Sequence, residues 1–371
     1  MTKLFFDETF AGFARNLTDW GEPSFRTRQI WAGVYRNLIF DPNAISNLPK
    51  GLREKIAAEY SFEPLSTVRR VVSSSGLTEK YLFALSDKAK IEAVLMRYRN
   101  RNTICISTQS GCAMNCAFCA TGQMGLTRNL TAGEIAGQVL YFAGRLKREE
   151  KQLTNVVVMG MGEPFHNYEN VMRAIDLIND PDGFRFGERR VTISTVGIIP
   201  MIEKFTKARR QINLAISLHA PTNFLRDQII PANKKYPVHD LVEAARRYAD
   251  FTKRRVSFEY AMIDGFNDSI EQAAQLAKLL RGTLCHVNLI SLNPTRKYAR
   301  SGSGRATIND FQAALEKAGI PCTIRLSRGV DIGAGCGQNF DVFQTQNHSG
   351  NGQHLHTRWE YRLFGYELES L

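Results

Sequence analysis

Short runs rich in β-branched residues alternate with amphipathic helical stretches along most of this chain. Such alternation favours a parallel β-sheet covered by helices, arranged as an open sheet or a closed barrel. It therefore predicts an α/β fold. We expect strands at 103–108, 154–159, 190–195, 212–218, 255–262, 286–292 and 321–326, with helices at 131–147, 168–179, 198–209, 238–252, 270–281 and 307–318.

The segments that flank this alternation have a different pattern. The first 65 residues contain helix-like stretches separated by glycine and proline breaks, which predicts a compact helical module. Three strand-like runs follow, and the last residues of the chain lose the alternation. We expect a helical accessory domain at 1–65, a β linker segment at 66–100, a core at 101–337 and a C-terminal tail at 338–371.

Residues whose side chains could bind a cofactor or take part in catalysis follow the predicted strands. In parallel sheets the carboxyl ends of the strands meet at one edge, where binding and catalytic residues collect. Ser194 or His219 alone would more often be a core residue than a ligand, but their shared edge favours a functional site. The residues expected there are Cys112, Cys116 and Cys119, the turn Gly160-Met161-Gly162-Glu163-Pro164, Ser194, Ser217-Leu218-His219, and Asn293.

Four of the seven cysteines lie within fifteen residues, which indicates metal or redox chemistry rather than a disulfide framework. Cys112, Cys116 and Cys119 have CxxxCxxC spacing. Three thiolates on one loop can hold three irons of a [4Fe–4S] cluster and leave the fourth open, where S-adenosylmethionine (SAM) can chelate. A zinc site is the alternative, but zinc normally takes four ligands in paired spacings and no second pair is present.

The net charge is a second constraint. The sequence carries a formal charge of +12 at pH 7, with basic residues spread along the chain. This excess favours RNA or DNA as a partner, because neutralised phosphates release counterions. A solvated surface that only keeps the protein soluble is an alternative that charge leaves open.

The apolar runs are much shorter than the ~20 residues that span a bilayer. The N-terminus has acidic residues where a signal peptide would have a basic region. We therefore expect a cytoplasmic protein with no membrane partner.

With these motifs in view, the chain resembles the RlmN/Cfr family of radical SAM RNA methyltransferases over about residues 5–340. The likeness is dense around TICISTQSGCAMNCAFCATGQMG, VVVMGMGEP, RRVTISTVGIIP, LAISLHAP, NLISLNP and DIGAGCGQ. The resemblance implies a partial (β/α) barrel core of the radical SAM type behind an RNA-binding helical domain.

The resemblance also implies roles for individual residues. Cys112, Cys116 and Cys119 would ligate one [4Fe–4S] cluster. Cys336 would carry a methyl group, Cys105 would be its partner thiol, and Glu92 would accept a proton. The residues that would hold SAM are Gly162, Glu163, Ser194, Ser217, Leu218, His219 and Asn293.

A chemical argument supports two lone cysteines. The amidine carbons of adenine are not nucleophilic, so direct methyl displacement from SAM fails there. A thiolate is a good nucleophile, and Cys336 can take a methyl group from one SAM. A radical from a second SAM would activate that methyl, which adds to the ring. Attack by Cys105 on the linking sulfur would release the product and leave a Cys105–Cys336 disulfide, which thiol exchange then resets.

Two branches of the family remain open. RlmN-like members modify carbon 2 of adenosine in 23S rRNA and in some tRNAs, whereas Cfr-like members modify carbon 8 of the same rRNA adenosine and confer antibiotic resistance. Pro164 favours RlmN, because Cfr sequences usually have alanine there. Gly335 departs from the alanine usual before the methylated cysteine.

The resemblance implies 23S rRNA and tRNA as partners, an electron donor such as flavodoxin, and a monomer. Two other hypotheses are an RNA-binding protein with a structural metal and a radical SAM enzyme that acts on a small molecule. Neither hypothesis gives Cys336 a purpose.

Overall fold

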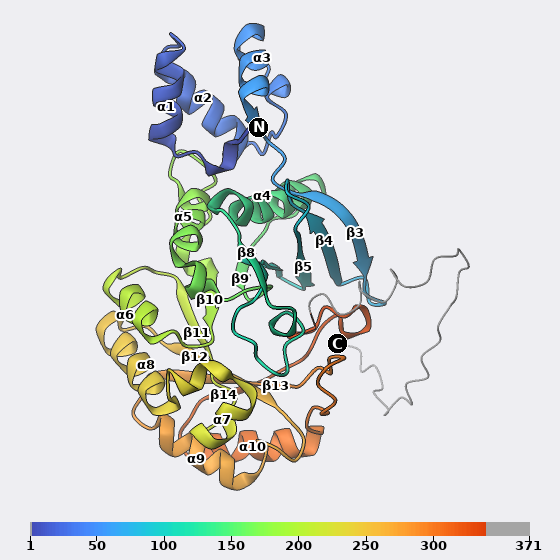
Figure 1. Cartoon of the computed structure of the whole chain (residues 1–371), viewed down its shortest axis with the longest axis vertical. Coiled ribbons are helices and arrows are strands. Elements are labelled where there is room, and N and C mark those ends of the chain that lie inside the picture. The colour runs from blue at the N-terminus through green and yellow to red at the C-terminus, as the bar shows by residue number, and fades with distance from the viewer. Residues whose placement is uncertain (1, 339–371) are drawn as a thin grey trace, which may run out of the picture.

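The computed structural model describes residues 2–338, and their centre is a ten-stranded sheet in the order β14-β13-β12-β11-β10-β9-β6-β5-β4-β3 (Figure 1). Seven of these strands are parallel, as the alternation predicted. They are β6 (Arg101–Cys105), β9 (Asn155–Val158), β10 (Val191–Thr195), β11 (Asn213–Ser217), β12 (Val256–Met262), β13 (Cys285–Ser291) and β14 (Cys322–Arg325).

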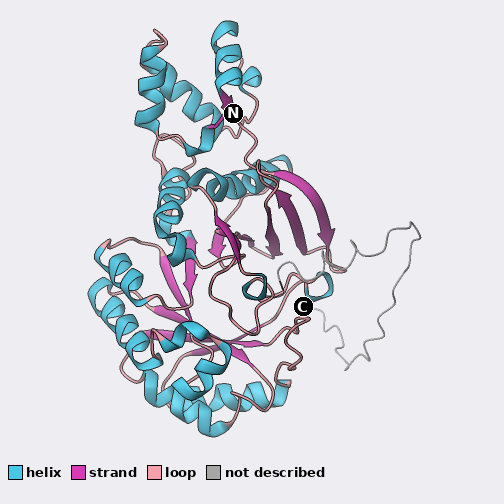
Figure 2. Ribbon diagram, viewed as in Figure 1, coloured by secondary structure: helices cyan, strands magenta, loops and turns pink. Residues whose placement is uncertain are grey.

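Helices cover the outer face of the curved sheet (Figure 2). The helix that follows the cysteine loop begins with the capping box expected at Thr131 and Glu134, in which each side chain bonds the backbone of the other residue. The short helix α7 (Asn223–Ile229) was not predicted; it lies at the carboxyl ends of β10 and β11, where Arg226 bonds the backbone of both. The helices that cover the outer face are α4 (Ala132–Arg148), α5 (Tyr168–Asn179), α6 (Ile199–Lys207), α8 (Val238–Thr252), α9 (Ile270–Leu280) and α10 (Arg305–Lys317).

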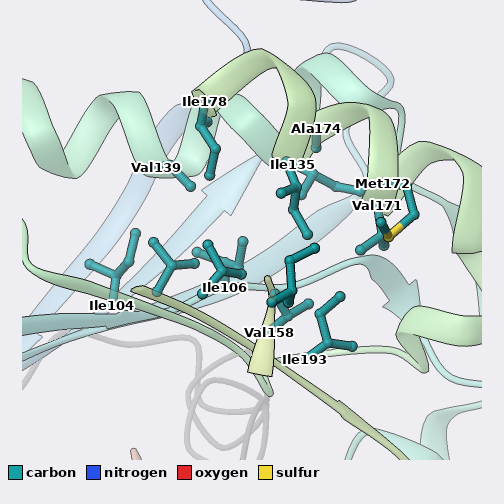
Figure 3. Packing of buried hydrophobic residues seen from close by; sticks show 14 of the residues in the cluster. Ile104, Ile106, Ile135, Val139, Val158, Val171, Met172, Ala174, Ile178 and Ile193 are labelled. Atoms are coloured by element: carbon teal, nitrogen blue, oxygen red, sulfur yellow. The ribbon is translucent and has the colours of Figure 1, made fainter. Parts of the chain in front are cut away.

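The residues of each parallel strand divide between the two faces of the sheet. Ile104, Val158 and Ile193 pack against Val139 of α4 and Ile178 of α5 (Figure 3). Burial of each such side chain contributes about 1.5–3 kcal/mol. Because side chains alternate along a strand, the residues between these apolar positions point to the concave face, where the candidate site lies.

The three strands before the core extend the same sheet. β3 (Ser66–Val72), β4 (Thr78–Ala84) and β5 (Lys90–Tyr98) form an antiparallel meander, and β5 pairs with β6. The segment expected to be a linker is thus continuous with the core by backbone hydrogen bonds. The boundaries at 65 and 100 remain a prediction.

The N-terminal residues form helices α1 (Phe10–Asp19), α2 (Phe25–Trp31) and α3 (Lys50–Glu59) beyond α4 (Figure 1). Their core is aromatic, with the Phe5 and Phe62 rings stacked at 4.5 Å. Of the tail expected at 338–371, only Gln338 lies within the described residues. None of the described helices is long and apolar enough to cross a bilayer.

Candidate active site

The CxxxCxxC loop leaves the carboxyl end of β6. A small antiparallel pair, β7 (Gln109–Gly111) with β8 (Leu126–Asn129), closes the loop at its base. Gly111 has φ +78°, and a Cβ there would lie 2.0 Å from the carbonyl oxygen of Gly125. Only glycine allows the backbones at 111 and 125 to come this close, so Gly111 sets the position from which the cysteine loop starts.

The three thiols of this loop are electrostatic neighbours. Burial and the nearby thiols raise the pKa of Cys116 well above its usual value, and burial raises the pKa of Cys119. Burial raises the pKa of Cys112 to about 12, and Cys119 adds to that rise. The thiols therefore lie near one another, and the Arg226 charge, which lowers the pKa of Cys116, does not offset the effect of burial. A bound metal group would supply the positive charge that holds the thiols ionised.

This donor set fits an iron–sulfur cluster better than a single ion. Residues 2–338 contain no group of three or more His, Cys, Asp or Glu side chains placed to hold one metal ion. Zinc needs its ligands about 2.0–2.3 Å from one centre. Three thiols on one loop, each for a different iron, suit a cubane with an open fourth iron. Cys112, Cys116 and Cys119 would be its ligands.

Replacement of Cys116 with alanine should remove the cluster, because two thiolates cannot hold three irons. We expect iron after anaerobic reconstitution to fall from about four per chain to near zero, with loss of the brown absorbance. Cys285→Ala is the matched control, since Cys285 is buried in the hydrophobic core far along the sheet on β13. Equal iron in the two variants would refute the ligand assignment.

The Gly160–Pro164 turn follows β9 and lies against the cysteine loop's first residues. Gly162 has φ +102°, and a Cβ there would lie 2.6 Å from Cβ of Gln109. The Glu163 amide donates to Oε1 of Gln109 at 2.8 Å. The Glu163 carboxylate accepts hydrogen bonds from Thr195 Oγ1 at 2.7 Å and from the Val196 amide at 2.8 Å. The side chain of Glu163 therefore joins two strand ends, and its own amide and carbonyl are bonded within the protein, to Gln109 and His166.

Gly162→Ala is expected to destabilise the protein through a steric clash in addition to the strain that a positive φ imposes on alanine. The new methyl would displace Gln109 and with it the bond to the Glu163 amide. Overpacking of this kind costs about 1–3 kcal/mol. Gly187→Ala is the matched control, because Gly187 has φ +95° with nothing within 4 Å of its Cβ position. The free energy of unfolding of the two variants, measured in urea, should differ by that amount; equal losses would contradict the clash.

Ser194, Ser217 and His219 meet at the ends of β10 and β11. The Ser194 and Ser217 hydroxyls are 3.4 Å apart. His219 has φ +61°, and its Nδ1 accepts from the Ala261 amide at 2.9 Å. Burial, together with Arg226, lowers the pKa of His219 to about 3, so the ring is neutral and carries its proton on Nε2. The Phe118 ring contacts it edge-on at 5.0 Å, which links His219 to the cysteine loop.

Leu218 and Asn293 hold parts of the backbone. The Leu218 side chain is fully buried, and its carbonyl accepts from Nε of Arg226 at 2.9 Å. The side-chain Nδ2 of Asn293 donates to the Cys336 carbonyl at 3.1 Å. The predicted ligands therefore do come to one edge of the sheet, although Leu218 and Asn293 bond protein groups there.

The loop that carries Cys336 is joined to the cysteine loop. The Ala120 amide donates to the Gly337 carbonyl at 2.9 Å. A Cβ on Gly335 would lie 2.7 Å from Nδ2 of Asn293 and 2.7 Å from Oε1 of Gln338. Glycine at 335 thus permits the close packing of this loop against Asn293, which gives a structural reason for the departure from alanine.

Cys105 and Cys336 line one cavity of about 650 Å³ on the concave face of the sheet. Burial and the proximity of Cys336 raise the pKa of Cys105 to about 12. Burial and the Glu259 carboxylate raise the pKa of Cys336 to about 12, although the side chain is open to the cavity. Both are protonated thiols at neutral pH, so the nucleophilic thiolate proposed for Cys336 requires removal of a proton.

Glu92 lies on β5 beside the Cys336 loop and is fully buried. Its Oε2 is 3.0 Å from Nζ of Lys80, whose side chain is also fully buried. The same Nζ donates to the Gly333 carbonyl at 2.9 Å. Lys80 thereby connects the predicted proton acceptor to the loop that carries Cys336.

Sequence reasoning missed three charged residues around the site: Lys80, Glu259 and Arg226. Arg226 is fully buried and donates to the carbonyls of Val196 at 2.6 Å and Ser217 at 3.1 Å, so it joins the ends of β10 and β11. The segment around Arg226 (Asn223–Ile229, NFLRDQI) mixes polar and apolar residues as a surface helix does, so nothing local showed that this arginine is buried. Burial of these groups depends on tertiary contacts that local pattern does not encode.

Comparisons with known proteins agree with this geometry. The sequence model of the Radical SAM superfamily matches residues 106–277. A crystal structure of a radical SAM methyltransferase from Sphaerobacter thermophilus superposes with a TM-score of 0.89 at 48% identity, covering 91% of this chain and 99% of that one. The probable dual-specificity RNA methyltransferase RlmN of Dictyoglomus thermophilum is 48% identical over 87% of this chain and 92% of its own. The dual-specificity RNA methyltransferase RlmN 1 of Myxococcus xanthus is 43% identical over 90% of this chain and 93% of its own.

The partial barrel and its three-cysteine loop define a radical SAM enzyme, a class that uses a [4Fe–4S] cluster and SAM. Within that class, the chain belongs to the RlmN family of dual-specificity RNA methyltransferases. The predicted fold class and the family resemblance are thereby confirmed.

Proposed function

We propose that this enzyme methylates carbon 2 of adenosine in both 23S rRNA and tRNA. The observation that carries the proposal is the shared cavity of Cys105 and Cys336, beside the cluster loop and Glu92. A simple methyl transfer to a nucleophilic atom would need neither thiol. The family name describes two RNA specificities, which supports two substrates for this chain.

Cys112, Cys116 and Cys119 would hold the cluster. The residues that would hold SAM are Gly162, Glu163, Ser194, Ser217, Leu218, His219 and Asn293. When bound, these groups supply a methyl group and a carbon-centred radical that abstracts hydrogen. Two SAM molecules per turnover meet these two needs.

The chain's own residues do the rest of the chemistry. Cys336 carries the methyl group as a thioether, and its glycine-flanked loop lies against both the cluster loop and the cavity. Glu92 accepts the proton that leaves the adenine ring, and the one electron released with it would pass to an acceptor such as the group that Cys112, Cys116 and Cys119 would hold. The Cys105 thiol attacks the sulfur of Cys336 and forms a Cys105–Cys336 disulfide. The carbon–sulfur bond to the product breaks, and the departing carbon takes the thiol proton to become the methyl group. External thiols then reduce that disulfide.

We propose carbon 2 rather than carbon 8 as the methylated atom because residue 164 is a proline, as is typical of the RlmN branch. This proline is buried at the first position of the 3₁₀ turn Pro164–Asn167, directly after Glu163. Its fixed φ stabilises the turn that would face SAM. The named relatives are of the RlmN type, and no finding favours the Cfr alternative.

We also propose that the enzyme acts as a monomer in the cytoplasm, where rRNA and tRNA are found. All the groups assigned to the reaction come from one chain. An external one-electron donor such as flavodoxin would reduce the cluster.

The test is mass spectrometry of nucleosides after reaction of reconstituted, reduced enzyme with methyl-labelled SAM and either RNA. Label in 2-methyladenosine from both RNAs is the expected result. Label in 8-methyladenosine would transfer the protein to the Cfr-type reaction. SAM cleavage without label in RNA would contradict the proposed substrate.

A further inference from the structure

Six cations line the same cavity as Cys105 and Cys336. Arg101 is the first residue of β6, and the run 253–255 (Lys-Arg-Arg) directly precedes β12. Arg325 and Arg328 come from the end of β14 and the loop after it. Cys105 is the last residue of β6, about 13 Å along the strand from Arg101 at ~3.3 Å per residue. The cavity therefore runs from a basic mouth to the two candidate thiols.

Among the described residues these six cations form no close ion pairs, although the charge of Arg325 acts on the Glu259 carboxylate and opposes the rise in its pKa. Within residues 2–338 none of them forms an ion pair with an aspartate or glutamate, whereas Arg97, Arg128 and Arg145 all do. The acid that the described residues contribute to the cavity is Glu259, and burial raises its pKa while Asn288 donates to it at 2.8 Å. A cavity lined by one sign of charge focuses its field on a ligand of the opposite sign.

An aromatic ring sits in the same mouth. The guanidinium carbon of Arg101 lies 4.2 Å from the centre of the Tyr98 ring, and that of Arg328 lies 4.3 Å from it. Cation–π contacts hold both guanidinium groups close to the ring. Proteins recognise unpaired RNA with such combinations, in which phosphates contact cations and bases stack on aromatic or guanidinium planes.

We propose that this basic mouth, formed by Arg101, Lys253, Arg254, Arg255, Arg325 and Arg328, is the RNA-docking surface through which the target adenosine enters. The inference rests on the proposed function, because it takes RNA as the substrate. A cavity of about 650 Å³ has room for one nucleoside but not for a helix, so the adenosine must be turned out of the RNA. The cations then hold the flanking phosphates around the opening of the cavity.

The experiment compares two double variants with equal charge change. Arg101→Gln/Arg255→Gln removes two exposed cations of the mouth, whereas Lys278→Gln/Lys317→Gln removes two exposed cations from α9 and α10 on the outside of the barrel. Binding of a short RNA hairpin with an unpaired loop adenosine to the reconstituted full chain is measured across a salt series. Unfolding curves of all proteins check that the fold is kept.

Each phosphate contact contributes about 0.7 to 1 to the slope of log affinity against log salt. We expect the mouth variant, which loses two such contacts, to have a slope smaller in magnitude by about 1.4 to 2. When the salt concentration is raised fourfold, the factor by which the wild type loses affinity should be roughly ten times the factor for the mouth variant. The control variant should match the wild type. RNA should also protect Lys253, but not Lys278, from acetylation.

Identical slopes for the two variants, or protection of Lys278 alone, would overturn the docking surface. Methylation of RNA by the wild type is scored separately by mass spectrometry. If the wild type methylates RNA while the mouth variant binds normally, the docking surface fails and the proposed function stands. If the wild type methylates no RNA, the proposed function itself fails.

Discussion

Cys336→Ala should abolish RNA methylation, while Cys105→Ala should stall the enzyme as a covalent protein–RNA adduct. The difference follows from the order of the proposed steps. Without the Cys336 thiol no methyl group is carried, so no bond to RNA forms. Without the Cys105 thiol the bond forms, but the described residues that line the cavity include no other thiol to attack the linking sulfur.

Labelled nucleoside analysis and a denaturing gel with labelled RNA measure the two outcomes. Methylated product should fall by at least a thousandfold in both variants, a loss of about 4 kcal/mol in barrier terms. A slow band containing protein and RNA should appear only with Cys105→Ala. Cys322→Ala is the control, since this cysteine is buried at the start of β14. Full turnover by Cys105→Ala, or an adduct in Cys336→Ala, would contradict the assigned roles.

Local sequence pattern predicted the parallel sheet well because each parallel strand is buried on its helix-facing side. Val156, Val158 and Ile193 are the kind of β-branched residues that such a position selects. The same logic placed the working residues at one edge, since all parallel strands end together. Strand β6 nevertheless begins at Arg101, earlier than predicted, because its first residues pair with β5.

The site was predicted less completely because its charges act through contacts distant in sequence. A hydrogen bond joins Lys80 and Gly333, which lie 253 positions apart, and no local sequence pattern predicts a contact over that separation. Strand β4, which carries Lys80, is covered on both faces, so alternation gave no sign of its environment. Glu92 was assigned by resemblance alone, and the geometry now provides a cationic partner for it.

Lys80→Met is expected to destabilise the protein by about 3–5 kcal/mol, because it leaves the Glu92 carboxylate buried without its cation. Both side chains of this pair are 0% exposed, and their charged atoms are 3.0 Å apart. The exposed pair Lys50–Glu54, with 82% and 61% of the side chains exposed and 3.7 Å between charges, is the contrast. Lys50→Met should cost under about 1 kcal/mol. The free energy of unfolding in urea measures both, and equal costs would refute the role of burial.

The double variant Lys80→Met/Glu92→Gln separates two sources of that cost. If the stranded carboxylate is responsible, removal of its charge should restore much of the stability lost in Lys80→Met. If the double variant is no more stable than Lys80→Met, the cost lies instead in the Gly333 carbonyl, which loses the hydrogen bond from Nζ. In that case Lys80 mainly holds the Cys336 loop, and methyl loading of Cys336 should fall in both variants. Recovery of stability with normal loading would instead show that Lys80 serves Glu92.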